Sequence, residues 1–318
     1  MAKASATRRP PVRRRPGAPA RATSAAPPKA GVRGWIGAAR PRTLPLAIAP
    51  VALGTGAVKG QSLDGTYWLA FLALAVALLL QIGVNFANDY SDGVRGTDRY
   101  RVGPARLTAS GAAKPRTVLV AAIVCFALAA AAGIAIVVVT QVWWLLAVGA
   151  AAIAAAWFYT GGKRPYGYAG FGEIAVFLFF GVAATTGTSF VIARIVPAES
   201  WFCALAIGCI AAAVLVVNNL RDIEQDAAAG KRTLSVRIGA TGSRILFGVL
   251  MLIPFLVVGY LSLFYPLAPL VFLVLLLAVP AVLITATART ARELILALSL
   301  TGIEALVYGL GLAAALSF

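Results

Sequence analysis

The chain has 318 residues, of which 60% are hydrophobic and 12% are charged, and its formal net charge is +17. Soluble domains are about 45–50% apolar, so this composition excludes an ordinary soluble protein. The chain contains no histidine, which excludes histidine bases and histidine metal ligands and leaves a hard cation held by oxygen as the kind of metal to expect.

The amino-terminal segment is basic and rich in Arg, Pro and Ala, and no acidic residue precedes Asp64. It lacks an apolar run, so we predict a disordered tail at residues 1–33 and no signal peptide. Much of the positive charge lies in this tail. We therefore expect the tail to contact anionic lipid on the cytoplasmic side, or to have no role. Nucleic-acid binding is not expected.

Residues 34–318 form one domain of largely uncharged runs, each about 20 residues long, which is the length a helix needs to cross a bilayer. Glycine and proline mark many of the ends of these runs. We predict an all-α, polytopic membrane fold with nine transmembrane helices at residues 35–58, 66–88, 117–139, 142–160, 171–193, 201–219, 244–264, 267–288 and 294–317.

The basic residues predict the orientation of these helices. With the amino terminus in the cytoplasm, only Lys59 and Arg194 fall in outer loops, so the positive-inside rule is obeyed throughout. The prediction is a multi-pass protein of the plasma membrane with its carboxyl terminus outside. Its three cysteines, Cys125, Cys203 and Cys209, lie inside predicted spans and offer neither a disulfide framework nor metal-ligand spacing.

Six of the eleven acidic residues gather in two short clusters that follow the second and sixth predicted spans, both on the cytoplasmic side. The clusters are Asp89, Asp92 and Asp98, then Asp222, Glu224 and Asp226. Asn88 and Asp92 are four residues apart, as are Asp222 and Asp226, so each pair shares one face of a helix. Two acids on one face repel each other, and Mg2+ bound to a diphosphate would relieve that repulsion.

Basic residues accompany both clusters: Arg106 and Lys114 follow the first, and Arg221, Lys231 and Arg232 surround the second. A departing diphosphate gathers negative charge on its oxygens, which Arg, Lys and metal ions stabilise. The pattern therefore favours chemistry on a diphosphate, against the alternative that these are simply solvated loops.

The two clusters resemble the motifs of the UbiA-type intramembrane prenyltransferases, Asn-Asp-x-x-Asp-x-x-x-Asp and Asp-x-x-x-Asp. Here they read Asn88-Asp89-Tyr90-Ser91-Asp92 and Asp222-Ile223-Glu224-Gln225-Asp226. The resemblance covers residues 33–318 and departs from the common spacing at Asp98. Within the family the chain is most similar to the branch that prenylates 1,4-dihydroxy-2-naphthoate in menaquinone synthesis. The segments that carry this similarity begin at Ala39, Asn85, Gly103, Tyr159 and Asn218.

The resemblance implies nine helices around a central cavity with its active site at the cytoplasmic face, and a transfer of a polyprenyl group from polyprenyl diphosphate to the aromatic acceptor with loss of CO2 and diphosphate. Its partners are those two substrates and the lipid bilayer. The implied Mg2+ ligands are Asn88, Asp89, Asp92, Asp98, Asp222 and Asp226. The implied catalytic residues are Asp92, Asp222, Asp226, Tyr159 and Lys163. The implied substrate-binding residues are Arg42, Asn85, Arg106, Arg221, Lys231 and Arg232.

Two alternatives stay open. The first is another acceptor within the same superfamily, such as hydroxybenzoate, haem, chlorophyllide, homogentisate or a sugar phosphate. The second is a secondary transporter, in which repeats and intramembrane acids also occur. Transporters place such charges near the bilayer midplane, whereas these acids gather at one face, and this favours the enzyme. For the acceptor carboxylate the sequence leaves Arg106, Lys163 and Arg164 as candidates.

Overall fold

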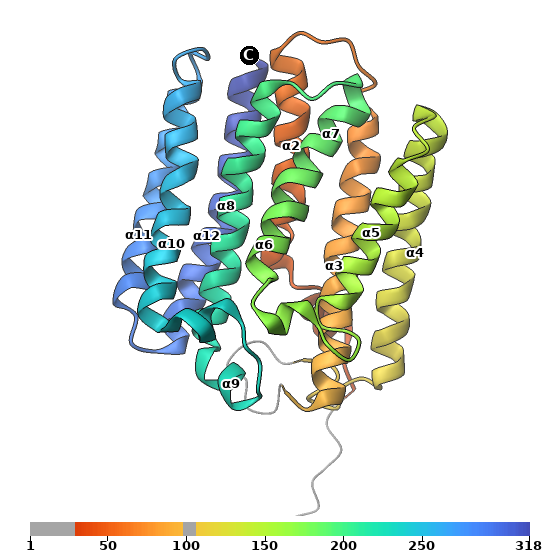
Figure 1. Ribbon diagram of the computed structural model, residues 1–318, viewed down its shortest axis with the longest axis vertical. Helices are drawn as coiled ribbons and strands as arrows, with labels where there is room; N and C mark the ends of the chain where they lie inside the picture. The colour runs from red at the N-terminus through yellow and green to blue at the C-terminus, as the bar shows by residue number, and fades with distance from the viewer. Residues whose placement is uncertain (1–28, 98–105) are drawn as a thin grey trace, which may run out of the picture.

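The structure is a computed structural model that describes residues 29–97 and 106–318. It is all-helical over these residues, and its helices run side by side in one bundle (Figure 1). The elements are α1 (Val32–Ala39), η1 (Pro41–Thr43), α2 (Pro45–Gly60), α3 (Leu69–Arg95), α4 (Pro115–Thr140), α5 (Leu145–Phe158), η2 (Tyr166–Ala169), α6 (Gly172–Val176), η3 (Phe177–Ala183), α7 (Ala184–Ala193), α8 (Ala198–Arg221), α9 (Ile223–Ala228), α10 (Leu234–Leu261), η4 (Ala268–Val274), α11 (Leu275–Thr287) and α12 (Ala291–Ser317).

Seven helical segments of the described chain are long and apolar enough to cross a membrane. The bent pair formed by α1 with η1 and α2, which turns through 46°, would make an eighth. The apolar helix α5 has only 14 residues. Each of the nine predicted ranges coincides with one of these segments, so the all-helical prediction is confirmed, whereas the number that crosses the bilayer stays a prediction.

Local sequence explains where several helices begin and end. Pro45 and Pro115 start α2 and α4, where the missing N–H of proline costs no hydrogen bond. The Thr290 hydroxyl accepts from the Glu293 N–H, and the Glu293 carboxylate accepts in return from the N–H of Arg289, which is close to a capping box. α3 ends at Gly96, whose φ of 74° is a left-handed conformation that favours glycine.

The predicted second span was too short. It was expected to end at residue 88, but α3 continues to Arg95, so Asp89 and Asp92 of the first acidic cluster lie on a helix and not in a loop. The extra turns are possible because hydrogen bonds and ion pairs satisfy the buried carboxylates of Asp89 and Asp92. Similarly, α1 begins at Val32, inside the predicted tail, and α10 begins at Leu234, well before the predicted start at residue 244.

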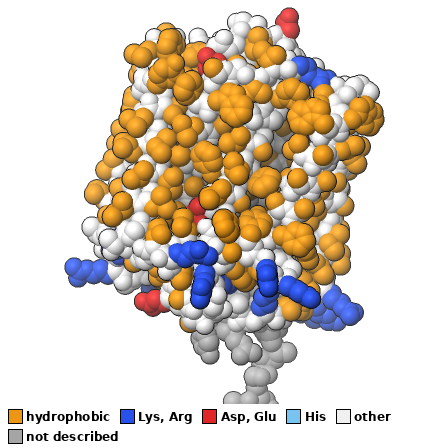
Figure 2. Space-filling view, viewed as in Figure 1, with side chains coloured by type: hydrophobic (Ala, Val, Ile, Leu, Met, Phe, Trp, Pro, Cys, Tyr) orange, Lys and Arg blue, Asp and Glu red, His pale blue; other side chains and the backbone are white. Residues whose placement is uncertain are grey.

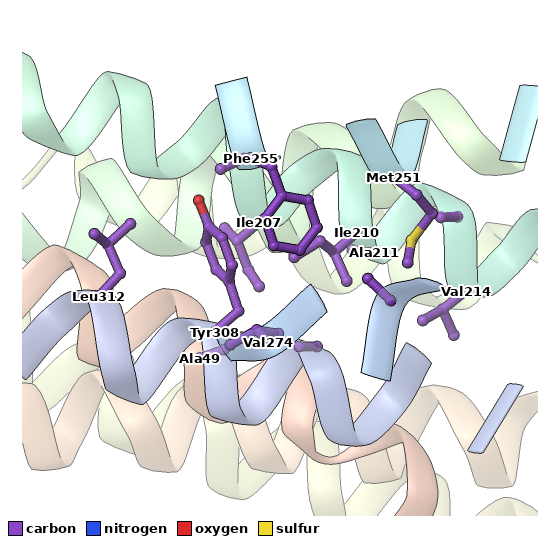
Figure 3. Close-up of a cluster of buried hydrophobic side chains, with 14 of the residues drawn as sticks. Ala49, Ile207, Ile210, Ala211, Val214, Met251, Phe255, Val274, Tyr308 and Leu312 are labelled. Atoms are coloured by element: carbon purple, nitrogen blue, oxygen red, sulfur yellow. The ribbon is translucent and has the colours of Figure 1, made fainter. Parts of the chain in front are cut away.

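Small residues let the central helices approach closely. A Cβ at Gly56 would lie 2.7 Å from the Cα of Ala313, and one at Gly309 would lie 2.8 Å from the Cα of Ala49, so α2 and α12 pack backbone to backbone as membrane helices often do. α8, α10 and α12 enclose the largest core cluster, in which Phe255 and Tyr308 meet edge to face (Figure 3). The Tyr308 hydroxyl donates to the carbonyl of Pro254 over 2.9 Å.

The surface is divided by chemistry. Hydrophobic side chains cover the middle of the molecule, and Lys and Arg side chains gather at its lower end in the view of Figure 2. This is the end that carries α9, opposite the carboxyl terminus (Figure 1). We call it the polar end, and the opposite one the far end.

Candidate active site

The first acidic cluster occupies the last turns of α3 at the polar end. Asn88, Asp89 and Asp92 are all buried. The Asp89 carboxylate accepts from the backbone N–H groups of Leu107 and Thr108, each over 2.8 Å. In this structure Asp89 therefore anchors the segment that leads into α4.

Asn88 has a different partner. Its side-chain oxygen accepts from the Thr160 hydroxyl over 2.6 Å, and the Arg95 guanidinium donates to the carbonyls of Thr160 and Gly162. These bonds connect the end of α3 to the loop that follows α5. The remaining predicted ligand of this cluster, Asp98, lies outside the described residues.

The second cluster sits where α8 passes into α9. Asp222 occupies the junction, with φ −100° and ψ 11°, and Asp226 lies one turn later on α9, its N–H bonded to the carbonyl of Asp222 over 2.8 Å. The buried Arg221 donates through Nε to the Asp222 carboxylate over 2.7 Å and through NH2 to the Asn218 side chain over 3.0 Å. The Arg221 guanidinium at the end of α8 is therefore paired with the Asp222 carboxylate.

Lys231 joins the two clusters. Its Nζ lies 3.5 Å from Oδ1 of Asp92 and 3.7 Å from Oδ1 of Asp226, so one cation is shared between acids that are far apart in the sequence. On its other carboxylate oxygen, Asp92 pairs with Arg106 over 3.4 Å. The two acids would repel each other without a positive charge between them, and in this structure the Lys231 ammonium supplies it.

Tyr168 completes this arrangement. Its hydroxyl donates to Asp92, and its ring lies 4.7 Å from the Lys231 ammonium and 5.5 Å from the Arg95 guanidinium, distances at which cation–π attraction acts. Burial, followed by the negative charge of Asp92, raises the pKa of Tyr168 well above its usual range. The hydroxyl therefore stays protonated and remains a donor.

A cavity of about 780 Å3 begins beside this cluster and extends toward the far end. At the polar end it is lined by Arg40, Arg42, Asn85, Asn88, Asp89, Arg106, Tyr159, Tyr166, Asn218 and Arg221. Beyond them the lining comes mostly from apolar side chains of α2 to α5, of η3 and α7, and of α8. Such a shape suits a ligand with a charged head and a long hydrocarbon tail.

The predicted residues divide into three groups. Arg42, Asn85, Tyr159, Arg106 and Arg221 line the cavity, as do Asn88 and Asp89. Asp92, Asp222 and Lys231 are buried directly behind that lining, with Asp226 half-buried beside Lys231. Lys163 and Arg232 are exposed and do not line the cavity in the described structure.

The donor set at the polar end suits a hard divalent cation. Carboxylate and amide oxygens are the protein ligands that Mg2+ prefers, and Asp92 and Asp226 already converge on one positive charge. Within residues 29–97 and 106–318, no three acidic side chains form a metal site by themselves. A site here would need the Asn88 amide, water or substrate oxygens to complete it.

The roles of Tyr168, Thr160 and Arg40 were missed by the sequence analysis. Arg40 lines the cavity from a left-handed conformation with φ 55° and ψ 69°, which is uncommon for a residue with a Cβ and tends to occur at functional sites. The segments containing these residues were noticed for their resemblance. No rule of sequence spacing predicts the hydrogen bond from Tyr168 to Asp92, because the two residues are 76 positions apart in the chain.

Comparison with known proteins gives a family model and named relatives. A model of the UbiA prenyltransferase family matches residues 47–315. A 1,4-dihydroxy-2-naphthoate octaprenyltransferase of Mycobacterium tuberculosis is 49% identical over 288 residues, which are 89% of this chain and 97% of the relative. The protein of the same description from Escherichia coli is 37% identical over 216 residues, 66% of this chain and 70% of the relative.

Solved structures agree on the fold. A UbiA homologue from Aeropyrum pernix aligns with a TM-score of 0.65 at 15% identity, covering 85% of this chain and 97% of its own. A UbiA homologue from Archaeoglobus fulgidus, bound to GPP and Mg2+, aligns with a TM-score of 0.62 at 19% identity, covering 90% and 100%. At these identities the likeness establishes the fold and no more.

Proposed function

The chain belongs to the UbiA prenyltransferase family, and on that premise we propose that it transfers a polyprenyl group from polyprenyl diphosphate to 1,4-dihydroxy-2-naphthoate. The products are CO2, diphosphate and the quinol form of demethylmenaquinone, which makes this a step of menaquinone synthesis. Support comes from the relatives of that description, one of them 49% identical over nearly its whole length. The acceptor rests on those relatives, and the class of enzyme rests on the family.

The observation that carries the chemical proposal is the convergence of Asp92 and Asp226 on one cation beside the polar end of the cavity. We assign Asn88, Asp92, Asp222 and Asp226 to holding Mg2+ with the diphosphate of the donor. Asp89 and Asp98, which were also predicted as ligands, are not assigned as direct ligands. When bound, Mg2+ neutralises the diphosphate oxygens and assists their departure. Asp89, whose carboxylate is occupied by two backbone N–H groups, acts by holding the segment after residue 105.

The basic residues of the chain hold the leaving group. Arg106 and Arg221 line the cavity and face the acids behind it, so their guanidinium groups are in reach of a diphosphate at the polar end and stabilise the charge that develops on it. Lys231, drawn toward Asp92 and Asp226 here, becomes available to phosphate oxygens once another cation lies between those acids. Arg42, Asn85 and Arg232 stay predicted substrate contacts.

The apolar cavity determines what happens to the allylic carbon. When its bond to oxygen breaks, the electron pair leaves with the diphosphate, and an electron-rich ring carbon of the acceptor attacks the resulting cation. Water would quench that cation, so the apolar lining is needed to exclude it. Of the three candidates for the acceptor carboxylate, Arg106 lines the cavity, whereas Lys163 and Arg164 are exposed. Arg106 is thus the one of the three that lines the cavity, but it is already assigned to the diphosphate, so we assign no partner to the acceptor carboxylate and place only Tyr159 at the border of the acceptor.

The same premise supports a topology. We propose nine crossings, made by the seven long apolar segments, the bent pair α1 to α2 and the short helix α5. The site acids Asp92 and Asp226 lie at the polar end, and most of the exposed Lys and Arg side chains in view share that end (Figure 2). The positive-inside rule assigns this end to the cytoplasm. We place the amino terminus and the active site on the cytoplasmic side of the plasma membrane. The basic tail predicted at residues 1–33 falls outside the described residues up to residue 28, so its contact with lipid stays a prediction.

A pair of variants on one short helix tests the metal assignment. Asp226→Ala removes an acid that shares Lys231 with Asp92, whereas Glu224→Ala removes an exposed acid of the same helix α9. We expect Asp226→Ala to abolish transfer and Glu224→Ala to retain it, with both proteins inserted and folded by detergent size-exclusion profile. Normal turnover in Asp226→Ala would overturn the assignment of α9 to the site.

A further inference from the structure

A second, smaller cavity lies on the outer face of the bundle, away from the acids. It measures about 360 Å3 and is bounded by η4, the start of α11 and the last turns of α12. Every side chain that lines it is apolar, and none of the described residues that line it also lines the active-site cavity. We call it the α12 groove. The prenyl transfer gives this groove no task, so a role inferred for it is independent of the proposed function.

η4 forms one wall of the groove. In a 3-10 helix, side chains three positions apart lie above one another, so η4 (Ala268–Val274) presents its side chains in rows. Leu270 and Leu273 are 61% and 66% exposed and form an outer row, whereas Val271 and Val274 are buried and form an inner row. The groove is therefore closed on its inner side and open on its outer side, where a membrane helix meets lipid.

α12 forms the opposite wall, which is lined by small residues. Gly311, Ala314 and Ala315 face the groove. A Cβ added at Gly311 would meet only the Cγ2 atom of Val271 within 4 Å, at a distance of 3.9 Å. No neighbouring backbone requires glycine at this position, although glycine is less stable than alanine inside a helix. The space between the two walls is thus left unfilled by the side chains of this chain.

The groove is about as long as one leaflet is deep. It extends along α12 from Val307 to Phe318, which is about 16 Å at a rise of 1.5 Å per residue. The hydrocarbon core of a bilayer is about 30 Å thick, so the acyl chains of one leaflet span about 15 Å. Phe318 lies at the far end, where the chain ends (Figure 1). An acyl chain of the leaflet at that end would therefore occupy the whole length of the groove.

Exposed aromatic side chains mark the level of the lipid headgroups at the far end. Trp68 precedes α3, Trp144 precedes α5, Trp201 lies in the first turn of α8 and Tyr260 in the last turn of α10. These four side chains are between 45% and 57% exposed. Trp and Tyr are enriched where a membrane protein meets the headgroups. Lys59, in the last turn of α2 at the same end, therefore lies near the headgroup level.

Lys59 also lies at the mouth of the groove. Its Nζ is 4.7 Å from the centroid of the Phe318 ring, within the range of cation–π attraction, and Phe318 lines the groove. Among the described residues Lys59 forms no ion pair. Glu199, an acid of the same end, instead accepts hydrogen bonds from Gln61 over 2.9 Å and Tyr265 over 3.1 Å. The mouth of the groove therefore carries a positive charge that suits an anionic headgroup.

We propose that the α12 groove binds an anionic phospholipid of the leaflet at the far end. One acyl chain lies between η4 and α12, in the space left open at Gly311, and the phosphate contacts the Lys59 ammonium. The length of the groove and the cation at its mouth both fit this occupant. A second copy of the chain would also cover the apolar walls, but it would leave the position of Lys59 unexplained.

The test measures which lipid occupies the groove in a bilayer. The full chain is placed in phosphatidylcholine nanodiscs that contain a trace of phosphatidylglycerol with a photoreactive diazirine in one acyl chain. A parallel sample contains phosphatidylcholine with the same photoreactive chain. After illumination, lipid adducts on residues 267–277 and 307–318 are quantified by peptide mass spectrometry. The readout is the ratio of phosphatidylglycerol to phosphatidylcholine adducts in these two segments.

We expect a ratio of about five in the wild type, which is the preference that one lysine near the membrane surface contributes. Lys59→Ala should lower the ratio to about one, and Lys59→Arg should retain it. Gly311→Phe places a ring in the groove and should reduce adducts of both lipids. Gly248→Phe is its matched control, because a Cβ at Gly248 also has open space and Gly248 lines neither cavity. Size-exclusion profiles show that each variant is folded.

Three results would overturn the proposal. One is equal labelling by the two lipids in the wild type, and another is a ratio that Lys59→Ala leaves unchanged. The third is the absence of adducts from either lipid in the two segments. In that case a dimer that Gly311→Phe dissociates would identify a second copy of the chain as the occupant. None of these results depends on turnover, so a failure here leaves the proposed function untouched.

Discussion

Replacing Tyr168 by phenylalanine isolates one contact of the site. Tyr168→Phe removes the hydroxyl that donates to Asp92 and keeps the ring that lies 4.7 Å from the Lys231 ammonium. A hydrogen bond to a charged group contributes about 1.5–3 kcal/mol. Residues that orient a metal-binding carboxylate typically change metal affinity by about 10–100-fold when removed. We expect the Mg2+ concentration for half-maximal transfer to rise within that range.

The assay is transfer rate against Mg2+ concentration at fixed, saturating donor and acceptor. Tyr166→Phe is the matched control, since its hydroxyl donates to the carbonyl of Ala155 over 2.9 Å and does not contact an acid. We expect Tyr166→Phe to lower the melting temperature slightly and to leave the Mg2+ dependence unchanged. Because the raised pKa keeps the Tyr168 hydroxyl protonated, the difference between the variants should not depend on pH across the working range. Identical Mg2+ curves for wild type and Tyr168→Phe would refute the reasoning that Tyr168 positions Asp92 for the metal.

Two further predictions concern stability. Asp89→Asn replaces a carboxylate that accepts from two backbone N–H groups with an amide, whose NH2 group cannot accept. We expect the free energy of unfolding to fall by about 1.5–3 kcal/mol and proteolysis after residue 105 to become faster. The Mg2+ dependence of the remaining activity should not change, and a shifted dependence would make Asp89 a ligand. Glu304 of α12 is fully buried and neither carboxylate oxygen has a hydrogen-bond partner in the described structure. Glu304→Gln keeps the shape and lowers the cost of burying a charge-bearing group, so its melting temperature should equal or exceed that of wild type, and a clear decrease would contradict this.

The fold could largely be predicted because a helix that crosses a bilayer needs about 20 apolar residues in a row, and such runs are easily recognised in a sequence. All nine predicted ranges correspond to helical segments, even where Pro254 and Pro280 lie inside helices. The errors came where polar residues continue a helix. α3 extends through Asp89 and Asp92 because backbone N–H groups after residue 105 satisfy Asp89, and because Lys231 and Arg106 pair with Asp92. A sequence window does not contain those partners.

The site could be predicted in its residue types and less well in its contacts. The two motifs indicated acids that require a shared cation, and the structure brings Asp92 and Asp226 to Lys231. The role of Tyr168 depends on how the loop between α5 and α6 folds over the end of α3, which no periodicity reports. Lys163 was selected by resemblance alone and lies exposed.

The central claim is tested most directly with purified protein in detergent, supplied with Mg2+, a long-chain polyprenyl diphosphate and 1,4-dihydroxy-2-naphthoate. Diphosphate release and the prenylated product are followed by mass spectrometry, with a chelator control and with hydroxybenzoate and homogentisate as other acceptors. The account predicts a decarboxylated, prenylated naphthoquinol that disappears with chelator and returns with added Mg2+. Product from another acceptor alone would contradict the assigned substrate, and no consumption of diphosphate by folded protein with any acceptor would contradict the assignment of a prenyl transfer.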